Sequence, residues 1–331
     1  MKKILLILSS LLISAPYITN AKNSIETQSK DESSETVNDI PDYYFKSAGG
    51  EQPGDPINNP SDLFYENNQT DFELVPNFEW FFKLKKEESF GYSEARYREK
   101  GKLKKGLCEY NSLAMILTYL ELFVTSEVIN DDNFRKYFDF GIKEEGKIQA
   151  PIHRYSFKEY ETMDSSLASK LWNLNNFKLD LLVGGSVQNT FNKWIQIQSR
   201  EANIANEYSA SFWHTSSPED NLLKHRVPVM MSWTKHKHNI VIFGYNKSTD
   251  SYVVHYGWPD SQPIRIIKKS LLWSTFSGGF WNAFYPNPNK PKQALKKRFK
   301  YQGELYSWTE LERMGKTAND FANMEFLDNY K

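Results

Sequence analysis

The sequence predicts an α+β protein in which a helical half precedes an antiparallel sheet. Apolar residues recur at helical spacing over residues 113–124, apolar segments separated by turn signals fill residues 227–267, and dense aromatic content begins at residue 63. The helical spacing indicates a helix with a buried face, and the short apolar segments between turns indicate neighbouring strands. With 331 residues, the chain is long enough to bury one large core.

The first 21 residues have the pattern of a secretory signal peptide. Lys2 and Lys3 precede an almost wholly apolar stretch at residues 4–13, and the segment ends with the small residue Ala21. Ten apolar residues are too few to cross a bilayer, and the later apolar stretch at 113–124 is interrupted by Glu121. We therefore expect a secreted or extracellular surface protein with no stable membrane span; an uncleaved anchor is the alternative.

Composition divides the remaining chain into three parts. Residues 22–62 are polar and rich in Ser, Glu, Asp and Asn, which predicts a flexible leader or a pro-segment. Residues 63–286 are expected to form the globular domain. Residues 287–331 begin with a Pro- and Asn-rich linker and are expected to be a basic C-terminal extension, whose run at 292–300 we interpret as a solvated face.

Within the domain, the elements follow in order. A helix is expected to begin near Cys108, directly after Gly106 and Leu107, with its apolar face over residues 113–124. The middle segment, 131–221, is expected to hold helices and loops, including a helix at 187–197. Beyond Arg226 the pattern changes to strands, which we expect at these four ranges: 227–233, 239–245, 251–256 and 263–267.

Charge and cysteine content limit the function classes. Lys plus Arg and Asp plus Glu each number 41, so no net field favours nucleic acid or another polyanion as partner. Nothing in the sequence indicates a cofactor, and the oligomeric state stays open. The single cysteine, Cys108, cannot form an intramolecular disulfide, which leaves a buried apolar role or a reactive thiol.

A cysteine at the start of a helix is placed for nucleophilic chemistry. Oriented backbone N–H groups lower the pKa of a thiol there, and an imidazole within reach completes a reactive pair. Of the six histidines, His238 is the strongest candidate because it opens an apolar strand, His-Asn-Ile-Val-Ile-Phe-Gly-Tyr. His236 is the alternative, since it lies two residues earlier and would share the same face of a strand.

These residues carry a resemblance to a known family. The segments Gly106-Leu107-Cys108-Glu109-Tyr110, residues 238–245 and Val254-His255-Tyr256-Gly257-Trp258 resemble the nucleophile, base and orienter segments of papain-like peptidases, including streptopain and the bacteriocin-processing peptidases. With Leu74-Val75-Pro76-Asn77-Phe78-Glu79-Trp80, the pattern is most similar to a cysteine peptidase family of wall-less bacteria. The separation of Cys108 and His238, about 130 residues, also fits papain-type enzymes.

The resemblance implies a papain-like fold, with a helical half packed on an antiparallel half-barrel, and a protein or peptide substrate. It implies that Cys108 is the nucleophile, His238 the general base and His255 the residue that orients His238, with Trp258 packed over the base. The expected function is that of an exported cysteine peptidase acting through a thioester acyl-enzyme. Transfer chemistry, such as amide crosslinking, would use the same pair.

Three departures from the family pattern favour a second hypothesis, a catalytically degenerate binding protein on the same scaffold. Glu109 replaces the usual Gly after the cysteine, and His255 replaces the usual Asn. The oxyanion hole of this clan uses a Gln or Asn upstream of the cysteine, and residues 79–107 contain neither. Its donor would have to be Lys102, Lys104, Lys105 or a residue from elsewhere in the chain.

A zinc site is a further alternative, formed by Cys108 with His236, His238 and His255. We favour the hydrolase over the metal site because the same residues stand where a Cys and His peptidase needs them, and we assign no metal ligand.

Overall fold

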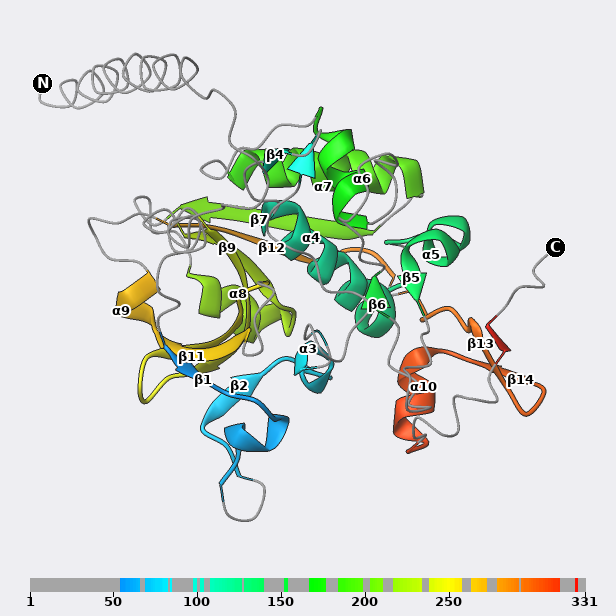
Figure 1. Cartoon of the computed structure of the whole chain (residues 1–331). Coiled ribbons are helices and arrows are strands. Elements are labelled where there is room, and N and C mark those ends of the chain that lie inside the picture. Colours follow the sequence, from blue (N-terminus) through cyan, green and yellow to red (C-terminus); the bar gives the residue numbers. More distant parts are fainter. Residues whose placement is uncertain are drawn as a thin grey trace, which may run out of the picture. The chain divides into compact units, whose positions relative to one another are not determined.

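Helices packed on an antiparallel sheet form the described part of the chain, which confirms the α+β class (Figure 1). The structure is a computed structural model, and all the residues it describes belong to one unit of the chain, residues 43–331. The described ranges are 54–65, 69–82, 84, 98–99, 102–103, 108–126, 128–139, 152–153, 167–176, 184–198, 203–210, 217–233, 238–257, 263–272, 279–291, 293–315 and 325–326. The expected signal peptide and most of the expected leader lie outside them.

The main sheet has eight strands among the described residues. Its order is β1, β11, β10, β9, β8, β12 and β7, with β2 also paired to β9, and all neighbours are antiparallel. The strand bounds are Asp55–Pro56 for β1, Phe72–Leu74 for β2, Ile204–Ala210 for β7, Val229–Trp233 for β8, His238–Asn246 for β9, Ser251–His255 for β10, Ile264–Lys268 for β11 and Gly279–Pro286 for β12. The four expected strands correspond to β8–β11.

Four strands of the main sheet lie where the sequence predicted none: β1, β2, β7 and β12. β7 falls in the segment expected to hold helices and loops, and it forms one edge of the sheet beside β12. β1 falls in the expected leader, yet it pairs with β11, and the Ile57 side chain that follows it is buried. The ordered sheet therefore begins before residue 63. Pairing with β11 provides hydrogen-bond partners for the backbone N–H and C=O groups of a segment that has few apolar side chains.

Helices α4 and α8 pack on the central strands β8 and β9. Every side chain of β9 is buried, and since successive side chains of a strand point to opposite faces, both faces of β9 are covered. The helices are α3 (Glu79–Phe82), α4 (Cys108–Tyr119), α5 (Asp131–Tyr137), α6 (Leu167–Leu174), α7 (Gly184–Gln198), α8 (Pro218–His225) and α9 (Lys269–Leu272), with the 3-10 turn η1 (Pro60–Leu63) and the π turn η3 (Leu120–Val124).

Helix α4 is the centre of the molecule. All twelve of its side chains are buried, and it contacts β8, β9, α6 and α7. A helix that is apolar on most sides is stable only when it is surrounded. The Phe81 ring of α3 stacks on Tyr119 of α4 and on Phe243 of β9, so the aromatic segment predicted to begin the packed domain fixes this helix to the sheet.

The N-terminal half of α4 is also tied to the end of β10. Asn111 Nδ2 donates a hydrogen bond of 3.1 Å to the carbonyl oxygen of Gly257. Gly257 has a φ of +66°, and a Cβ atom there would lie 2.8 Å from Asn111 Nδ2. The approach of helix and strand at this point therefore requires glycine.

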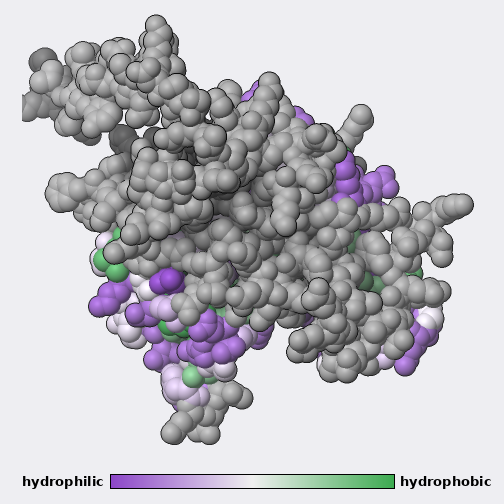
Figure 2. Space-filling view, in the orientation of Figure 1, coloured by the Kyte–Doolittle hydropathy of each residue, from purple (hydrophilic) through white to green (hydrophobic). Residues whose placement is uncertain are grey.

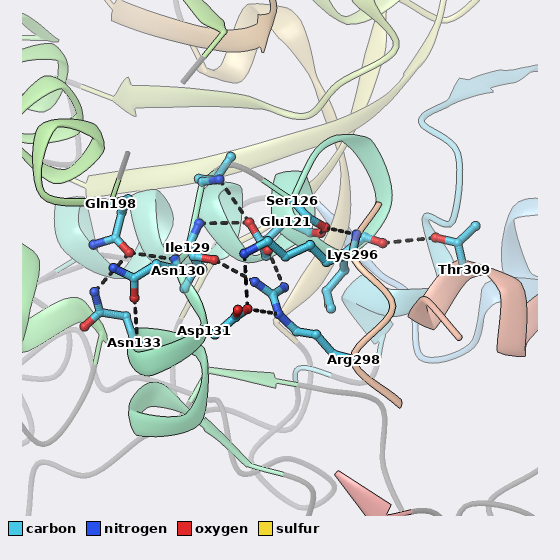
Figure 3. Close-up of polar contacts among 12 residues, drawn as sticks. Glu121, Ser126, Ile129, Asn130, Asp131, Asn133, Gln198, Lys296, Arg298 and Thr309 are labelled. Atoms are coloured by element: carbon cyan, nitrogen blue, oxygen red, sulfur yellow. Dashed lines mark hydrogen bonds and ion pairs between the residues drawn. The ribbon is translucent and has the colours of Figure 1, made fainter. Parts of the chain in front are cut away.

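The C-terminal segment is anchored to the other end of α4 by a buried polar network (Figure 3). The Glu121 carboxylate of η3 accepts hydrogen bonds from the backbone N–H groups of Val128 and Ile129 and pairs with the Arg298 guanidinium. Arg298 also donates to the Ile129 carbonyl and to Asp131, each at 2.8 Å. Arg298 is therefore buried, whereas Lys296 and Lys297 are exposed, so the expectation that residues 292–300 form a solvated face is wrong only for the end of this run.

Short elements complete this C-terminal part. Residues after Arg298 form a small sheet and a helix, β13 (Phe299–Tyr301), β14 (Glu304–Tyr306), β15 (Glu325–Phe326) and α10 (Trp308–Arg313). α10 contacts η3, and Thr309 Oγ1 donates 3.0 Å to the Leu122 carbonyl. Two further strand pairs are β3 (Arg98–Glu99) with β4 (Lys102–Leu103), and β5 (Phe138–Asp139) with β6 (Ile152–His153).

The coloured surface in Figure 2 is mostly hydrophilic. The large apolar side chains that the described residues expose are scattered over different parts of the chain: Tyr65, Ile197, Leu223, Leu271 and Met314. Single exposed apolar residues are normal and do not mark a docking surface. No helix within the described ranges is long and apolar enough to cross a membrane.

Candidate active site

Cys108 is the first residue of α4, as predicted, and its side chain is 4% exposed. The first N–H groups of a helix have no partner within it and favour negative charge nearby. The sulfur accepts a hydrogen bond from Asn239 Nδ2 in β9 at 3.6 Å. The helix start and the beginning of β9, far apart in the sequence, are therefore in direct contact at the sulfur.

The charge state of this thiol is set by opposing effects. Burial raises the pKa of Cys108 to about 11, the hydrogen bond from Asn239 lowers it, and the neighbouring Glu109 carboxylate raises it. Glu109 itself is 2% exposed, so water does little to screen its charge. In this arrangement the thiol keeps its proton at neutral pH, and a base must remove it before the sulfur can act as a nucleophile.

His238, the predicted base, is the first residue of β9 and is buried. Its Nε2 atom lies 2.6 Å from the Tyr256 carbonyl oxygen, and its ring stacks on the Tyr256 ring with centroids 6.0 Å apart. A carbonyl only accepts, so Nε2 carries the proton, and Nδ1 is the basic nitrogen of the neutral ring. Nδ1 is therefore the atom that could receive a thiol proton.

The structure does not join Cys108 and His238 by a hydrogen bond. Among the described residues, the sulfur bonds to Asn239, the neighbour of His238 along β9. Catalytic hydrogen bonds are often long in unliganded enzymes and tighten with substrate. The pairing of Cys108 with His238 stays a prediction.

His255 ends β10 and is fully buried, with both ring nitrogens in hydrogen bonds to backbone. Nδ1 accepts from the Gly257 N–H at 2.9 Å, so Nε2 carries the proton and donates to the Leu84 carbonyl at 3.0 Å. A neutral imidazole makes one hydrogen bond at each nitrogen. The His238 ring donates instead to the Tyr256 carbonyl, and the orienting role of His255 stays a prediction.

Asn239 is the site residue that sequence reasoning missed. Its Nδ2 faces the Cys108 sulfur, and its Oδ1 accepts from Ser232 Oγ at 2.5 Å. The family pattern places the amide donor upstream of the cysteine, and a donor from elsewhere in the chain was expected without a named residue. The available signal was an amide inside an otherwise apolar strand, directly after the candidate base, because such a residue needs a partner when it is buried.

Other predicted site residues cannot be placed. His236, Trp258, Lys104 and Lys105 lie outside the described residues, and Lys102 is described only as part of β4. Within the described part of the chain, no group of three or more His, Cys, Asp and Glu side chains could hold a metal ion.

Comparison with known proteins adds no relative to this picture. The sequence matches no protein-family model, and it matches no curated protein. The functional argument therefore depends on the residues and their geometry.

Proposed function

We propose that this protein is an exported cysteine peptidase with a papain-like arrangement, in which Cys108 is the nucleophile and His238 the general base. The observation that carries the proposal is the position of the Cys108 sulfur at the start of α4 against the first residues of β9, the strand that His238 opens. Neighbouring side chains of a strand point to opposite faces, so the contact of the sulfur with Asn239 does not itself pair it with His238. An α+β core with a buried helix packed on an antiparallel sheet is the framework that such an arrangement needs. Protein or peptide is the proposed substrate.

The proposed reaction has two stages. His238 Nδ1 takes the Cys108 proton, the sulfur attacks the peptide carbonyl carbon, and the carbonyl electron pair moves onto oxygen. That oxygen re-forms the double bond as the C–N bond breaks, and the imidazolium gives its proton to the leaving amine. Water, deprotonated by the same ring, then attacks the thioester, which releases the carboxylic acid and restores the thiol.

Hydrolysis of fluorescein-labelled casein tests this mechanism. Cys108→Ala and His238→Ala should each reduce the rate by several orders of magnitude, because nucleophile and base act as a unit. Lys247→Ala, an exposed change in the turn after β9, is the matched control and should leave the rate unchanged. Hydrolysis by Cys108→Ala at the wild-type rate would refute the assignment.

Export is proposed from the N-terminal pattern alone. Expression of the full chain in a bacterium with an intact secretory pathway should give a mature protein that begins at Lys22, the residue after Ala21. Mass spectrometry of the exported fraction provides the measurement. Recovery of the protein only with Met1 still attached would contradict the proposal.

A catalytically inactive binding protein is the second candidate, and the raised pKa of the buried thiol favours it. The pH profile of iodoacetamide alkylation separates the two, and Cys108 is the only cysteine in the chain. An activated thiol is labelled quickly at pH 6, and His238→Ala shifts its profile toward higher pH. An inert thiol reacts about tenfold faster per pH unit up to a pKa of about 11, with or without His238.

A further inference from the structure

The environment of the Cys108 sulfur contains one fixed amide donor. Asn239 is fully buried, and its Nδ2 lies 3.6 Å from Sγ. Its Oδ1 accepts from the Ser232 hydroxyl, which is also buried and directly opposite Asn239 in the β8–β9 register. Because the hydroxyl occupies the oxygen end of the amide, the N–H end is held toward the sulfur.

This position suits an oxygen that becomes negative during the proposed reaction. When sulfur adds to a carbonyl carbon, the carbonyl oxygen lies two bonds from the sulfur and takes up the displaced electron pair. An effective donor lies about 2.7–3.1 Å from that oxygen. A donor that lies 3.6 Å from the sulfur is within reach of an oxygen two bonds from that sulfur.

We propose that the Asn239 side-chain amide is the oxyanion-hole donor of this site, held in place by Ser232. The inference rests on the proposed peptidase function and deepens it, since it supplies the donor that residues 79–107 lack. Asn239 is a catalytic residue in this scheme, and Ser232 is a positioning residue. The partner donor would be the Cys108 backbone N–H at the start of α4.

If Asn239 had only a structural role, its removal would have a different effect. In that case the amide only satisfies Ser232 and packs against the thiol, and its removal lowers stability without a selective effect on acyl transfer. Alkylation by iodoacetamide distinguishes the two roles, because it needs the thiolate but forms no oxyanion. Addition of the thiol to a peptide aldehyde, which converts the carbonyl oxygen into the hydroxyl of a hemithioacetal, needs the oxyanion donor.

The experiment compares wild type, Asn239→Ala, Asn239→Asp, Ser232→Ala and the control Asn246→Ala. The control removes a buried Asn from the far end of β9, where it holds a turn through Ser248 and Thr249. Three quantities are measured: kcat/KM on fluorescein-labelled casein, the dissociation constant of an N-acetylated peptide aldehyde, and the limiting alkylation rate at high pH. Circular dichroism gives the folded fraction, to which every value is normalised.

Asn239→Ala should lower kcat/KM by about 100- to 1,000-fold and raise the dissociation constant of the aldehyde, while the limiting alkylation rate changes little. Asn239→Asp preserves the side-chain volume and replaces the Ala variant in the test if that variant does not fold. Its kcat/KM should fall at least as far, because a carboxylate repels the oxyanion. Ser232→Ala should lower kcat/KM by about twofold to tenfold, which is the effect of one neutral hydrogen bond. Asn246→Ala should match wild type.

Two results would overturn the inference, and they differ. If wild type cleaves casein and both Asn239 variants retain kcat/KM within about twofold, another group stabilises the oxyanion, and the peptidase proposal survives. If wild type neither cleaves casein nor binds the aldehyde, both proposals fail together.

Discussion

The pKa of the Cys108 thiol depends in part on one neighbouring carboxylate, that of Glu109. Glu109 raises this pKa, although burial is the larger cause. Glu109→Gln removes the charge while preserving the shape, so we expect the alkylation profile of Cys108 to shift toward lower pH. Glu304→Gln, an exposed change of equal charge in β14, should leave the profile in place. Equal shifts in both variants would mean that net charge, and not the neighbouring carboxylate, acts on the thiol.

At the residue scale, the sequence indicated candidate side chains but not their hydrogen bonds. Cys108, His238 and His255 were proposed from a helix start and from strand patterns, and all three are buried and hydrogen-bonded to backbone or side chains. Their hydrogen bonds depend on where neighbouring strands place carbonyl groups. The Tyr256 carbonyl that fixes His238 has no side-chain signature, which is why no sequence pattern could identify it.

At the element scale, the contact between α4 and the end of β10 depends on Gly257. Gly257→Ala requires a left-handed backbone for Ala and places its Cβ against Asn111 Nδ2, so we expect a loss of about 2–4 kcal/mol in the free energy of unfolding. Gly303→Ala is the matched control, since Gly303 has a φ of +87° but open space around its Cβ position. It should lose only about 1–2 kcal/mol. Urea unfolding gives both values, and equal losses would show that the Asn111 contact contributes nothing.

The Arg298 network fixes the opposite end of α4. Burial raises the pKa of Glu121 to about 7, although Arg298 opposes the shift. Arg298→Met should cost about 3–5 kcal/mol at pH 8, because it leaves a buried carboxylate without its cation. The cost should be smaller at pH 5, where Glu121 can take up a proton.

Two variants control this prediction. Glu121→Gln combined with Arg298→Met should be more stable at pH 8 than Arg298→Met alone, because the uncompensated charge is gone. Lys297→Met removes an exposed cation that pairs with Glu310 and should change stability by less than about 1 kcal/mol. A loss for Arg298→Met that is the same at both pH values would exclude ionised Glu121 as its cause.

The intact Glu121 should also make the wild-type protein less stable as pH rises. Its folded pKa, about 7, lies above the ordinary value of 4.5, so the neutral carboxyl is favoured in the folded state. This contribution is fully present below about pH 4.5 and is lost as pH rises toward 7. Comparison of urea unfolding of wild type and the double variant over pH 4–8 isolates it, and parallel curves would contradict the assignment.

At the scale of the whole molecule, the periodicity of apolar residues was sufficient to predict the fold class and the central elements of the fold. The start of α4 and the strands β8–β11 were predicted because their apolar patterns are strong and local. β1 and β7 were missed because an edge strand exposes one side and is stabilised largely by backbone pairing with a distant segment. β2 and β12 were also missed, although β12 lies between β7 and β8. The C-terminal segment was interpreted as an extension because its composition is basic, whereas its packing includes the pairing of Arg298 with a carboxylate 177 residues earlier, Glu121.

The burial of the C-terminal segment predicts that the chain does not tolerate its removal. A chain that ends at residue 291 loses Arg298 and the buried side chains of Phe299, Trp308 and Leu311, each worth about 1.5–3 kcal/mol. It also uncovers Leu122 and leaves Glu121 unpaired at the end of the helix that carries Cys108. We expect a lower melting temperature, increased binding of a hydrophobic dye and faster alkylation of Cys108 at pH 7. A chain that ends at residue 315 retains these contacts and is the control. Equal melting temperatures for the two truncated chains would show that residues 293–315 form a dispensable extension after all.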